Sequence, residues 1–212
     1  MNKLNPKLLI FDFDGTLADT WNVYEHAIPH FLEQEGVSIA RSLIHKLMGR
    51  KVKHILPELG VRNQKIINSV KKSVNEYALE HAKQIKKCKG INVLKKLKKK
   101  YKMFIVSNSI TKDVKKMAYF LKIEKYFNKI IGGEHFIFKE HIIKKIMKEK
   151  KLKKSEVIYI GDRAGDSEIA RKAGCLSIII ANSCSWNSKD KIIGSKPDFV
   201  VSSLDGLKKI LE

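Results

Sequence analysis

Short apolar runs and amphipathic stretches alternate along this chain, and their spacing divides it into two parts. Residues 8–11 are consecutive apolar side chains, so the segment 7–11 is predicted to be a buried strand. Between residues 18 and 87 the apolar positions recur at helical spacing, and no convincing strand is expected there. The pattern therefore predicts a strand followed by an inserted all-helical unit.

Amphipathic segments within residues 18–87 predict the helices of this unit. The first has an apolar face that begins at Trp21, and Pro29 is expected to kink or break it. A second helical segment lies near residues 39–48. The last is a long amphipathic helix for which Asn63 is the expected N-cap, because an Asn side chain can accept a free backbone N–H.

After Gly90 the chain changes to an alternation of short β-rich runs and amphipathic segments. The runs predict strands at residues 103–106, 129–131, 157–160, 176–180 and, as an edge strand, 199–201. The intervening segments predict helices, one of which Thr111 is expected to cap. Repeated βα units imply a parallel sheet with helices on both faces. We therefore expect an α/β fold in which residues 1–17 and 88–212 form the sheet-containing part and residues 18–87 the helical part.

The segment directly after the first strand, Asp12-Phe13-Asp14-Gly15-Thr16, carries the main candidate chemistry. Buried carboxylates are costly unless they are paired or bound to a metal. One carboxylate can attack phosphorus, and a second can protonate the leaving oxygen and later activate water. Asp is also common in turns after strands, but the complete segment after a buried strand favours catalysis, with Gly15 allowing the tight turn.

Two further polar segments follow predicted strands. Ser107 and Asn108 come directly after residue 106, where a hydroxyl can donate to a phosphate oxygen or can simply cap a turn. Asp162 and Asp166 lie four residues apart in a loop that contains Gly161. Their carboxylates can hold one side of a Mg²⁺ ion, although Asp166 also suits the N-cap of the next helix. Sites form where parallel strands end, so these segments are expected to meet.

A phosphoryl-transfer site also needs a fixed cation against the phosphate oxygens. Lys139 lies between the strand predicted at residues 129–131 and the helix that follows. Lys144 and Lys145 are nearby alternatives, but their helical positions are expected to face away from the strand ends. About one residue in six is Lys, so a match at one position has a high false-positive risk.

Together these segments resemble the haloacid dehalogenase-like phosphohydrolase superfamily. Residues 12–16 look like its first motif, residues 105–108 its second and residues 161–174 its fourth. The usual Gly-Lys-Pro-x-Pro flank of the family lysine is replaced by Phe138-Lys139-Glu140-His141. The resemblance covers essentially the whole chain and implies a Rossmann-like three-layer core with a type-one helical cap domain at residues 18–87. Most similar are the phosphoglycolate phosphatase-like and β-phosphoglucomutase-like branches.

The resemblance implies a Mg²⁺-dependent phosphatase that hydrolyses a small phosphorylated metabolite through an aspartyl-phosphate. A phosphoglycolate-like acid, a sugar phosphate and a nucleotide are all compatible substrates. The nucleophile and the acid–base group are implied to be Asp12 and Asp14. The Mg²⁺ ligands are implied to be Asp12, Asp14 through its backbone carbonyl, and Asp162, with Asp166 in support. The groups that bind the phosphoryl oxygens are implied to be Ser107, Asn108 and Lys139.

Other activities of the superfamily differ in what they require. Dehalogenation and phosphonate cleavage need no acid two residues after the nucleophile, so the presence of Asp14 disfavours both. A phosphosugar mutase needs the same motifs and remains an alternative to a phosphatase. In the cap, Arg50 with Lys51 is positioned to contact a substrate carboxylate or second anion, or is ordinary basic surface.

The formal net charge of +21 offers a hypothesis from a different class, a nucleic-acid-associated protein or DNA-end phosphatase. Only five of the 43 basic residues are Arg, the residue preferred for bidentate phosphate contacts. The chain also contains no helix-turn-helix, zinc or aromatic nucleic-acid motif. Nucleic acid is therefore the less favoured partner, and duplex binding that weakens steeply with salt would support it.

The apolar runs and the cysteines of the chain indicate its cellular location. The longest apolar runs, such as residues 176–181, are too short to span a bilayer. The first seven residues lack the features of a signal peptide. Cys88, Cys175 and Cys184 are scattered and without metal-ligand spacing. These observations predict a cytoplasmic protein without a membrane partner.

Overall fold

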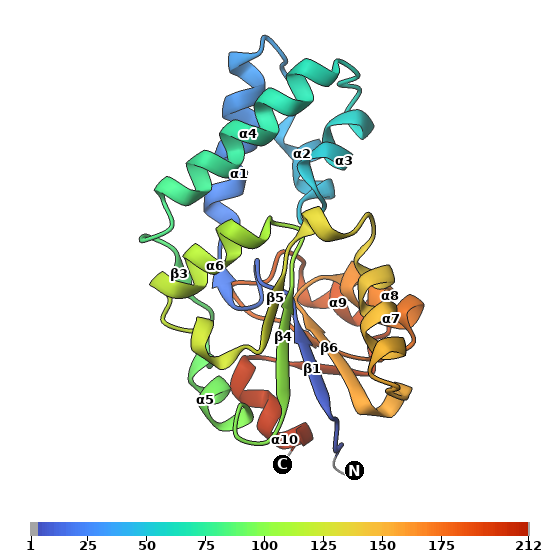
Figure 1. The fold of residues 1–212 in the computed structure, drawn as a ribbon. Coiled ribbons are helices and arrows are strands. Elements are labelled where there is room, and N and C mark those ends of the chain that lie inside the picture. Colours follow the sequence, from blue (N-terminus) through green and yellow to red (C-terminus); the bar gives the residue numbers. More distant parts are fainter. Residues whose placement is uncertain (1–3, 212) are drawn as a thin grey trace.

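A computed structural model describes residues 4–211, in which six strands form one parallel sheet with the order β5-β4-β1-β6-β7-β8 (Figure 1). Its strands are β1 (Leu8–Phe11), β4 (Lys102–Val106), β5 (Lys129–Ile131), β6 (Val157–Gly161), β7 (Leu176–Ile180) and β8 (Phe199–Val201). The predicted α/β class with a Rossmann-like parallel sheet is confirmed.

The centre of the sheet brings three loops together. Phe11 of β1 lies beside Ile105 of β4 on one side and Ile160 of β6 on the other. After β1 the chain forms β4 on one side of that strand, and it later forms β6 on the other side. This reversal of strand order creates the switch point at which α/β sheets bind ligands. The loops after β1, β4 and β6 begin at this edge, so the motif residues that follow these strands become neighbours.

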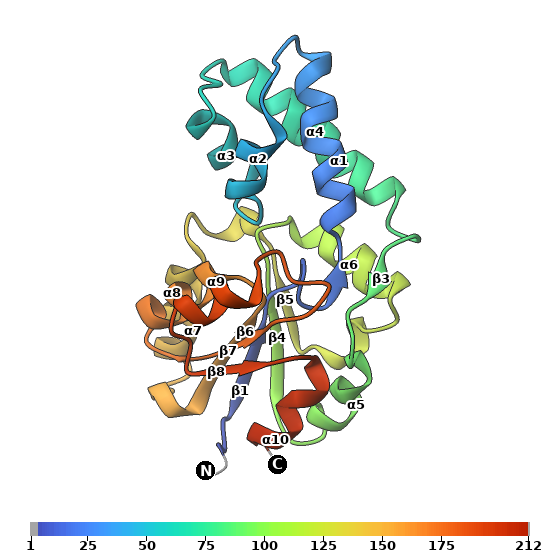
Figure 2. The same ribbon diagram turned by 180° about the vertical axis from the view of Figure 1, so that it is seen from behind.

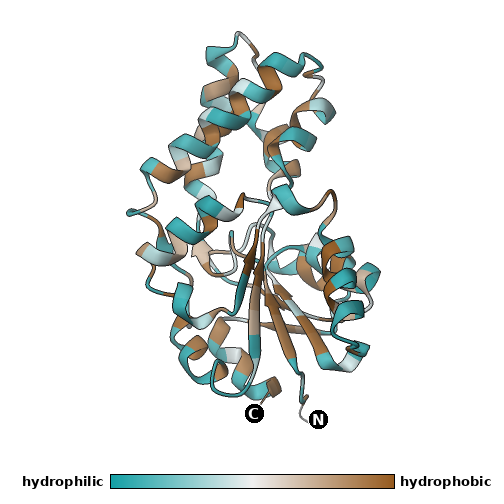
Figure 3. Ribbon diagram, in the orientation of Figure 1, coloured by the Kyte–Doolittle hydropathy of each residue, from teal (hydrophilic) through white to brown (hydrophobic). Residues whose placement is uncertain are grey.

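Both faces of the sheet are covered, which explains why its strands are mostly apolar (Figure 3). Side chains alternate between faces along β1: Leu9 and Phe11 belong to one cluster, Leu8 and Ile10 to the other. The first cluster includes residues of α5 (Leu94–Leu97), α6 (Thr111–Phe120) and α10 (Leu207–Leu211). The second includes residues of α7 (Lys139–Glu149) and α8 (Ala164–Ala173), and α9 (Lys189–Gly194) packs beside α8 (Figure 2).

Four helices form a separate hydrophobic cluster beyond the carboxyl ends of the strands (Figure 1). These helices, here called the helical unit, are α1 (Trp21–Gln34), α2 (Arg41–Leu47), α3 (Val52–Glu58) and α4 (Gln64–Glu80). Ile28 of α1 and Val70 and Val74 of α4 are buried in this cluster. The Asn63 side chain accepts the N–H of Lys65, which confirms the predicted N-cap.

Three local predictions are wrong. Helix α1 runs through Pro29 to Gln34 without a break. Two short strands, β2 (Ala18–Asp19) and β3 (Lys86–Lys87), pair antiparallel where the helical unit joins the sheet, and two residues are too few to give a periodic signal. Thr111 is the first residue of α6 and not its cap, because its hydroxyl instead accepts the N–H of Gly132 after β5.

Short 3-10 helices complete the connections: η1 (Ile91–Val93), η2 (Glu124–Tyr126), η3 (Gly133–His135), η4 (Lys154–Glu156) and η5 (Leu204–Gly206). No helix in residues 4–211 combines the length and the apolar character that a membrane crossing requires.

Candidate active site

Asp12 lies at the centre of the site because it is the first residue after β1. Its backbone N–H donates to the Ile160 carbonyl at 2.8 Å, which ties the loop to β6. One carboxylate oxygen, Oδ2, lies 2.8 Å from Lys139 Nζ, and both side chains are almost fully buried. The other, Oδ1, accepts the Phe13 N–H. The ion pair and the N–H bond together fix the direction in which this carboxylate points.

Lys139, the partner of Asp12, is the first residue of α7. It is 3% exposed, and besides Asp12 it donates to the Tyr159 hydroxyl at 2.9 Å. The alternatives Lys144 and Lys145 are exposed. Of these three lysines, Lys139 alone has the position that a phosphate-neutralising cation requires.

The Asp14 carboxylate is held by three hydroxyl groups. Thr20 donates to Oδ1 at 2.9 Å, and Ser107 and Ser109 donate to Oδ2 at 3.2 and 2.9 Å. Burial, followed by the charge of Asp12, raises the pKa of Asp14 despite these hydrogen bonds. A raised pKa suits a carboxyl group that must deliver a proton. The Tyr24 hydroxyl of α1 lies 3.1 Å from Ser109 Oγ, so the helical unit reaches this group as well.

Sequence reasoning missed three of the groups around Asp14: Thr20, Ser109 and Tyr24. Ser109 lies two residues after Ser107, and Thr20 lies six residues after Asp14. Hydroxyl residues at such spacings are common in turns, so only the sheet and the start of α1 bring them to one carboxylate.

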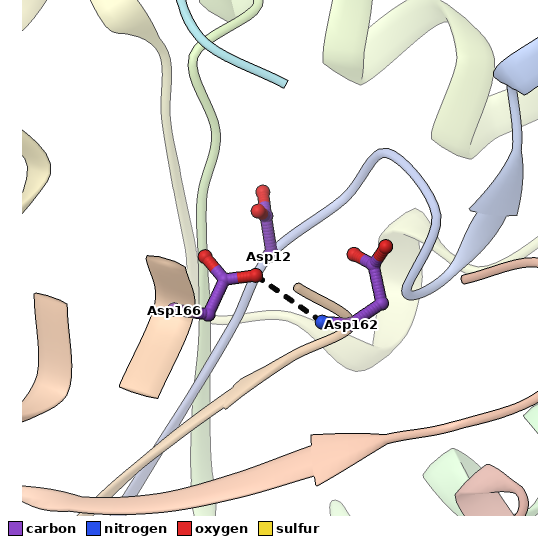
Figure 4. A group of neighbouring side chains, drawn as sticks. All are labelled: Asp12, Asp162 and Asp166. Atoms are coloured by element: carbon purple, nitrogen blue, oxygen red, sulfur yellow. Dashed lines mark hydrogen bonds between the residues drawn. The ribbon is translucent and has the colours of Figure 1, made fainter. Parts of the chain in front are cut away.

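Asp12, Asp162 and Asp166 form the group that fits a metal ion (Figure 4). One oxygen from each lies within 4.8 Å of the others, and all three residues are buried. Burial, followed by the charge of Asp166, raises the pKa of Asp162. A cluster of carboxylate oxygens is the donor set that Mg²⁺ prefers, and clustered buried carboxylates of this kind need a cation. The Asp14 carboxylate is not part of this group.

Loop geometry holds the two aspartates after β6 in place. Thr16 Oγ1 and the Trp186 N–H donate to the two oxygens of Asp162, at 2.9 and 2.8 Å. Gly15 has a φ of +76°, and a Cβ there would lie 2.4 Å from Asp162 Oδ2, so only glycine lets the first loop approach this carboxylate.

Asp166 is the third residue of α8 rather than its N-cap. Arg163 occupies the cap position. One Asp166 oxygen accepts the Asp162 N–H at 3.2 Å (Figure 4) and also the Arg163 N–H at 3.0 Å. Burial by itself would raise the pKa of Asp166, but the charges of Arg163 and Lys139 and these N–H bonds lower it overall. Asp166 therefore remains ionised and belongs both to the helix start and to the carboxylate group.

The three remaining candidates, Ser107, Asn108 and Arg50, contact different partners. Ser107 is buried and contacts Asp14, whereas the Asn108 side-chain amide donates to the Gly49 carbonyl at 2.8 Å. Arg50 makes a two-bond pair with Glu58 of α3 at 2.6 and 2.5 Å. Its guanidinium is thus already paired within the helical unit, although the residue lines the same cavity.

The side chain of Lys51, next to Arg50, contacts the loop after β5. Its ammonium donates to the carbonyl oxygens of Gly133, at 2.6 Å, and of Phe136. Burial, with a contribution from the charge of Lys53, lowers the pKa of Lys51 to about 8. This cation therefore acts as a contact between the helical unit and the loop after β5.

A cavity of about 110 Å³ lies between the helical unit and the strand ends. Asp12, Asp14 and Arg163 line it from the sheet side, and Tyr24 and Met48 line it from the helical unit. A small molecule in this cavity would contact the carboxylates and the helices together. Asp12, a member of the group that fits a metal ion, and Asp14 thus face one small space.

Comparison with known proteins identifies the family. Residues 9–180 match the family model of haloacid dehalogenase-like hydrolases, and the chain belongs to this family. The resemblance drawn from the motifs is thereby confirmed.

Individual relatives carry more specific names. The chain is 31% identical to a phosphoglycolate phosphatase of Vibrio parahaemolyticus over 52% of this chain, and spans only 49% of that protein's length. It is 24% identical to a phosphoglycolate phosphatase of Aquifex aeolicus over 97% of both chains. The crystal structure of a predicted phosphatase from Clostridium acetobutylicum superposes with a TM-score of 0.83 at 23% identity, covering 97% of this chain and 98% of that one. The last comparison supports the fold.

Proposed function

We propose that this hydrolase is a Mg²⁺-dependent phosphatase that acts on a small phosphorylated metabolite through an aspartyl-phosphate. The observation that carries the proposal is the buried contact of Asp12 with Lys139, within the carboxylate group that Asp162 and Asp166 complete. Phosphoryl transfer needs a nucleophile, a fixed cation and a metal ion in one place. The curated relatives, which are named phosphoglycolate phosphatases, favour a small phosphorylated acid as substrate.

The chemistry follows from the positions of two carboxylates. An oxygen of Asp12 attacks phosphorus while the bond from phosphorus to the ester oxygen breaks. Asp14 gives its proton to the departing alkoxide. Asp14, now a carboxylate, takes a proton from a water molecule that attacks the phosphorus of the aspartyl-phosphate, which releases phosphate and restores Asp12.

The other site residues support these two steps. Lys139 neutralises charge on the phosphoryl oxygens. The Ser107 hydroxyl, which donates to Asp14 in the free protein, donates to a phosphoryl oxygen when substrate is bound. Bound Mg²⁺ would be held by Asp12, Asp162 and Asp166 with the Asp14 backbone carbonyl, and would supply positive charge against the transferred group.

In this proposal residues 18–87 form a cap over a core made of residues 1–17 and 88–212. The cavity lined from both sides supports it, as do the contacts of Tyr24 with Ser109 and of Lys51 with Gly133. A cap that closes over the site keeps bulk water away from phosphorus while Asp12 attacks it.

Metal removal tests the proposal directly. The purified protein is expected to release inorganic phosphate from 2-phosphoglycolate or p-nitrophenyl phosphate in the presence of Mg²⁺. EDTA should reduce the rate by about 10²-fold or more, because a metal contributes several kcal/mol to the transition state. Excess Mg²⁺ should restore it. Absence of phosphate release across a panel of phosphate esters, or full activity in EDTA, would contradict the proposal.

Replacing Asp14 with Asn separates the two chemical steps. p-Nitrophenolate leaves without a proton, so D14N should still give one rapid equivalent of p-nitrophenol per enzyme. Steady-state turnover should fall by about 10²- to 10⁴-fold, because no base activates water. With an alkyl phosphate the first step should be lost as well. A rapid-quench measurement checks this, and a missing burst with p-nitrophenyl phosphate would remove Asp14 from the acid–base role.

A further inference from the structure

Arg163 is a buried cation between two of the carboxylates that fit a metal ion. The residue is 8% exposed, although it lies in a loop. Its Nη2 lies 3.3 Å from Asp166 Oδ1 and 3.7 Å from Asp12 Oδ2. Its Nη1 donates to the Met48 carbonyl of the helical unit at 3.4 Å. The guanidinium therefore lies between the nucleophile and the helices that cover it.

The loop that follows α2 in the helical unit packs closely against this guanidinium. Gly49 has a φ of +85°, and a Cβ at this position would lie 2.2 Å from Arg163 Nη1. Any other residue would thus be strained in its backbone and would collide with the side chain. The loop after α2 thus leaves room for a guanidinium that lines the cavity.

The contacts that Arg163 makes are long for a charged group. Charge-assisted hydrogen bonds are typically about 2.7–2.9 Å, whereas its carboxylate and carbonyl contacts span 3.3–3.7 Å. Asp12 already has a closer partner, Lys139, at 2.8 Å. A guanidinium has five N–H donors in a planar fork. These geometries leave Arg163 able to exchange its long contacts for a shorter, two-bond pair.

The other basic side chains of the cavity are less suited to this role. Arg50 is paired with Glu58, and Lys51 donates to backbone carbonyls. Lys53 and Lys71 line the cavity from exposed positions. Arg163 thus combines burial, proximity to Asp12 and a position facing the helical unit.

From this geometry we propose that Arg163 determines specificity by binding a carboxylate on the leaving-group side of a small phosphate ester. Lys139 holds the phosphoryl side, and the guanidinium fork matches a planar carboxylate with two parallel hydrogen bonds. The cavity of about 110 Å³ favours an acid in which carboxylate and phosphate are separated by few atoms. This inference rests on the proposed phosphatase function and adds the residue that selects the substrate.

The test compares two substrates that differ in the carboxylate. For 2-phosphoglycolate, R163Q should raise KM by about 10- to 100-fold, the loss expected when a charge-assisted pair is removed. For ethyl phosphate, which lacks the carboxylate, the factor by which R163Q lowers kcat/KM should be at least about ten times smaller than for 2-phosphoglycolate, since no such pair is lost. R163K keeps the charge without the fork and should recover only part of the affinity. R171Q, at an exposed arginine of the same helix, is the matched control and should behave like the wild type.

The outcomes separate the possibilities. Equal losses on both substrates in R163Q and R163K would show that Arg163 only attaches the helices to the sheet, and would overturn the inference. So would an unchanged KM for 2-phosphoglycolate, or a wild type without preference for it over ethyl phosphate. A wild type that releases phosphate from no ester would instead overturn the proposed function itself. Thermal unfolding identifies a variant that has lost its fold. If R163Q is unfolded, the losses of R163K on the two substrates decide between the outcomes.

Discussion

The variant D12N is expected to lose Mg²⁺-dependent hydrolysis of p-nitrophenyl phosphate by about 10⁴-fold or more, because an amide cannot form the aspartyl-phosphate. An aryl phosphate is the appropriate substrate, since its good leaving group needs no help from a proton donor. Any residual rate therefore reports on the nucleophile. Steady-state release of p-nitrophenol measures the loss.

The fold of D12N should persist. Asparagine keeps the shape of Asp12, and its side-chain oxygen can still accept from the Lys139 ammonium, while Asp166 stays beside Arg163. A melting temperature within a few degrees of the wild type is the expected control. Turnover retained at more than a few per cent of wild type by this folded variant would exclude Asp12 as the nucleophile.

The variant K139Q is expected to lower kcat by about 10²- to 10³-fold, the usual consequence of removing one fixed donor from a developing charge. Its stability should fall too, because removal of one partner from a buried ion pair costs about 3–5 kcal/mol. Activity is therefore measured below the melting temperature of the variant, which circular dichroism provides.

K144Q is the matched control, because it removes the same charge from an exposed side chain five residues further along α7. It should leave both kcat and the melting temperature within error of the wild type. Equal activity losses in K139Q and K144Q would mean that the general positive field, and not the contact with Asp12, accounts for the effect.

The strands and the site carboxylates could be predicted from the sequence because both follow from how parallel sheets are built. Buried parallel strands are uninterrupted apolar runs, and the residues after them meet at one edge of the sheet. Asp12, Ser107 and Asp162 could therefore be grouped before any coordinates. Lys139 could not be separated from chance among so many lysines, and its assignment depends on the distance to Asp12 that the fold provides.

What the sequence could not provide was the direction of neighbouring side chains. Arg50 and Lys51 are adjacent, yet the first turns to Glu58 and the second crosses to Gly133. The extended backbone at Lys51, directly before α3, decides which of them faces the sheet. Thr111 illustrates the same limit, since its hydroxyl accepts a long-range N–H instead of capping its own helix.

The four residues from Met48 to Lys51 have a mechanical consequence. Met48 accepts from Arg163 after β6, Gly49 accepts from Asn108 after β4, and Lys51 donates to Gly133 after β5. One short segment is thus fastened to three different strand ends. Separating the helices from the sheet requires this segment to leave all three strand ends, so its position couples access to the cavity with the loops that carry the site residues.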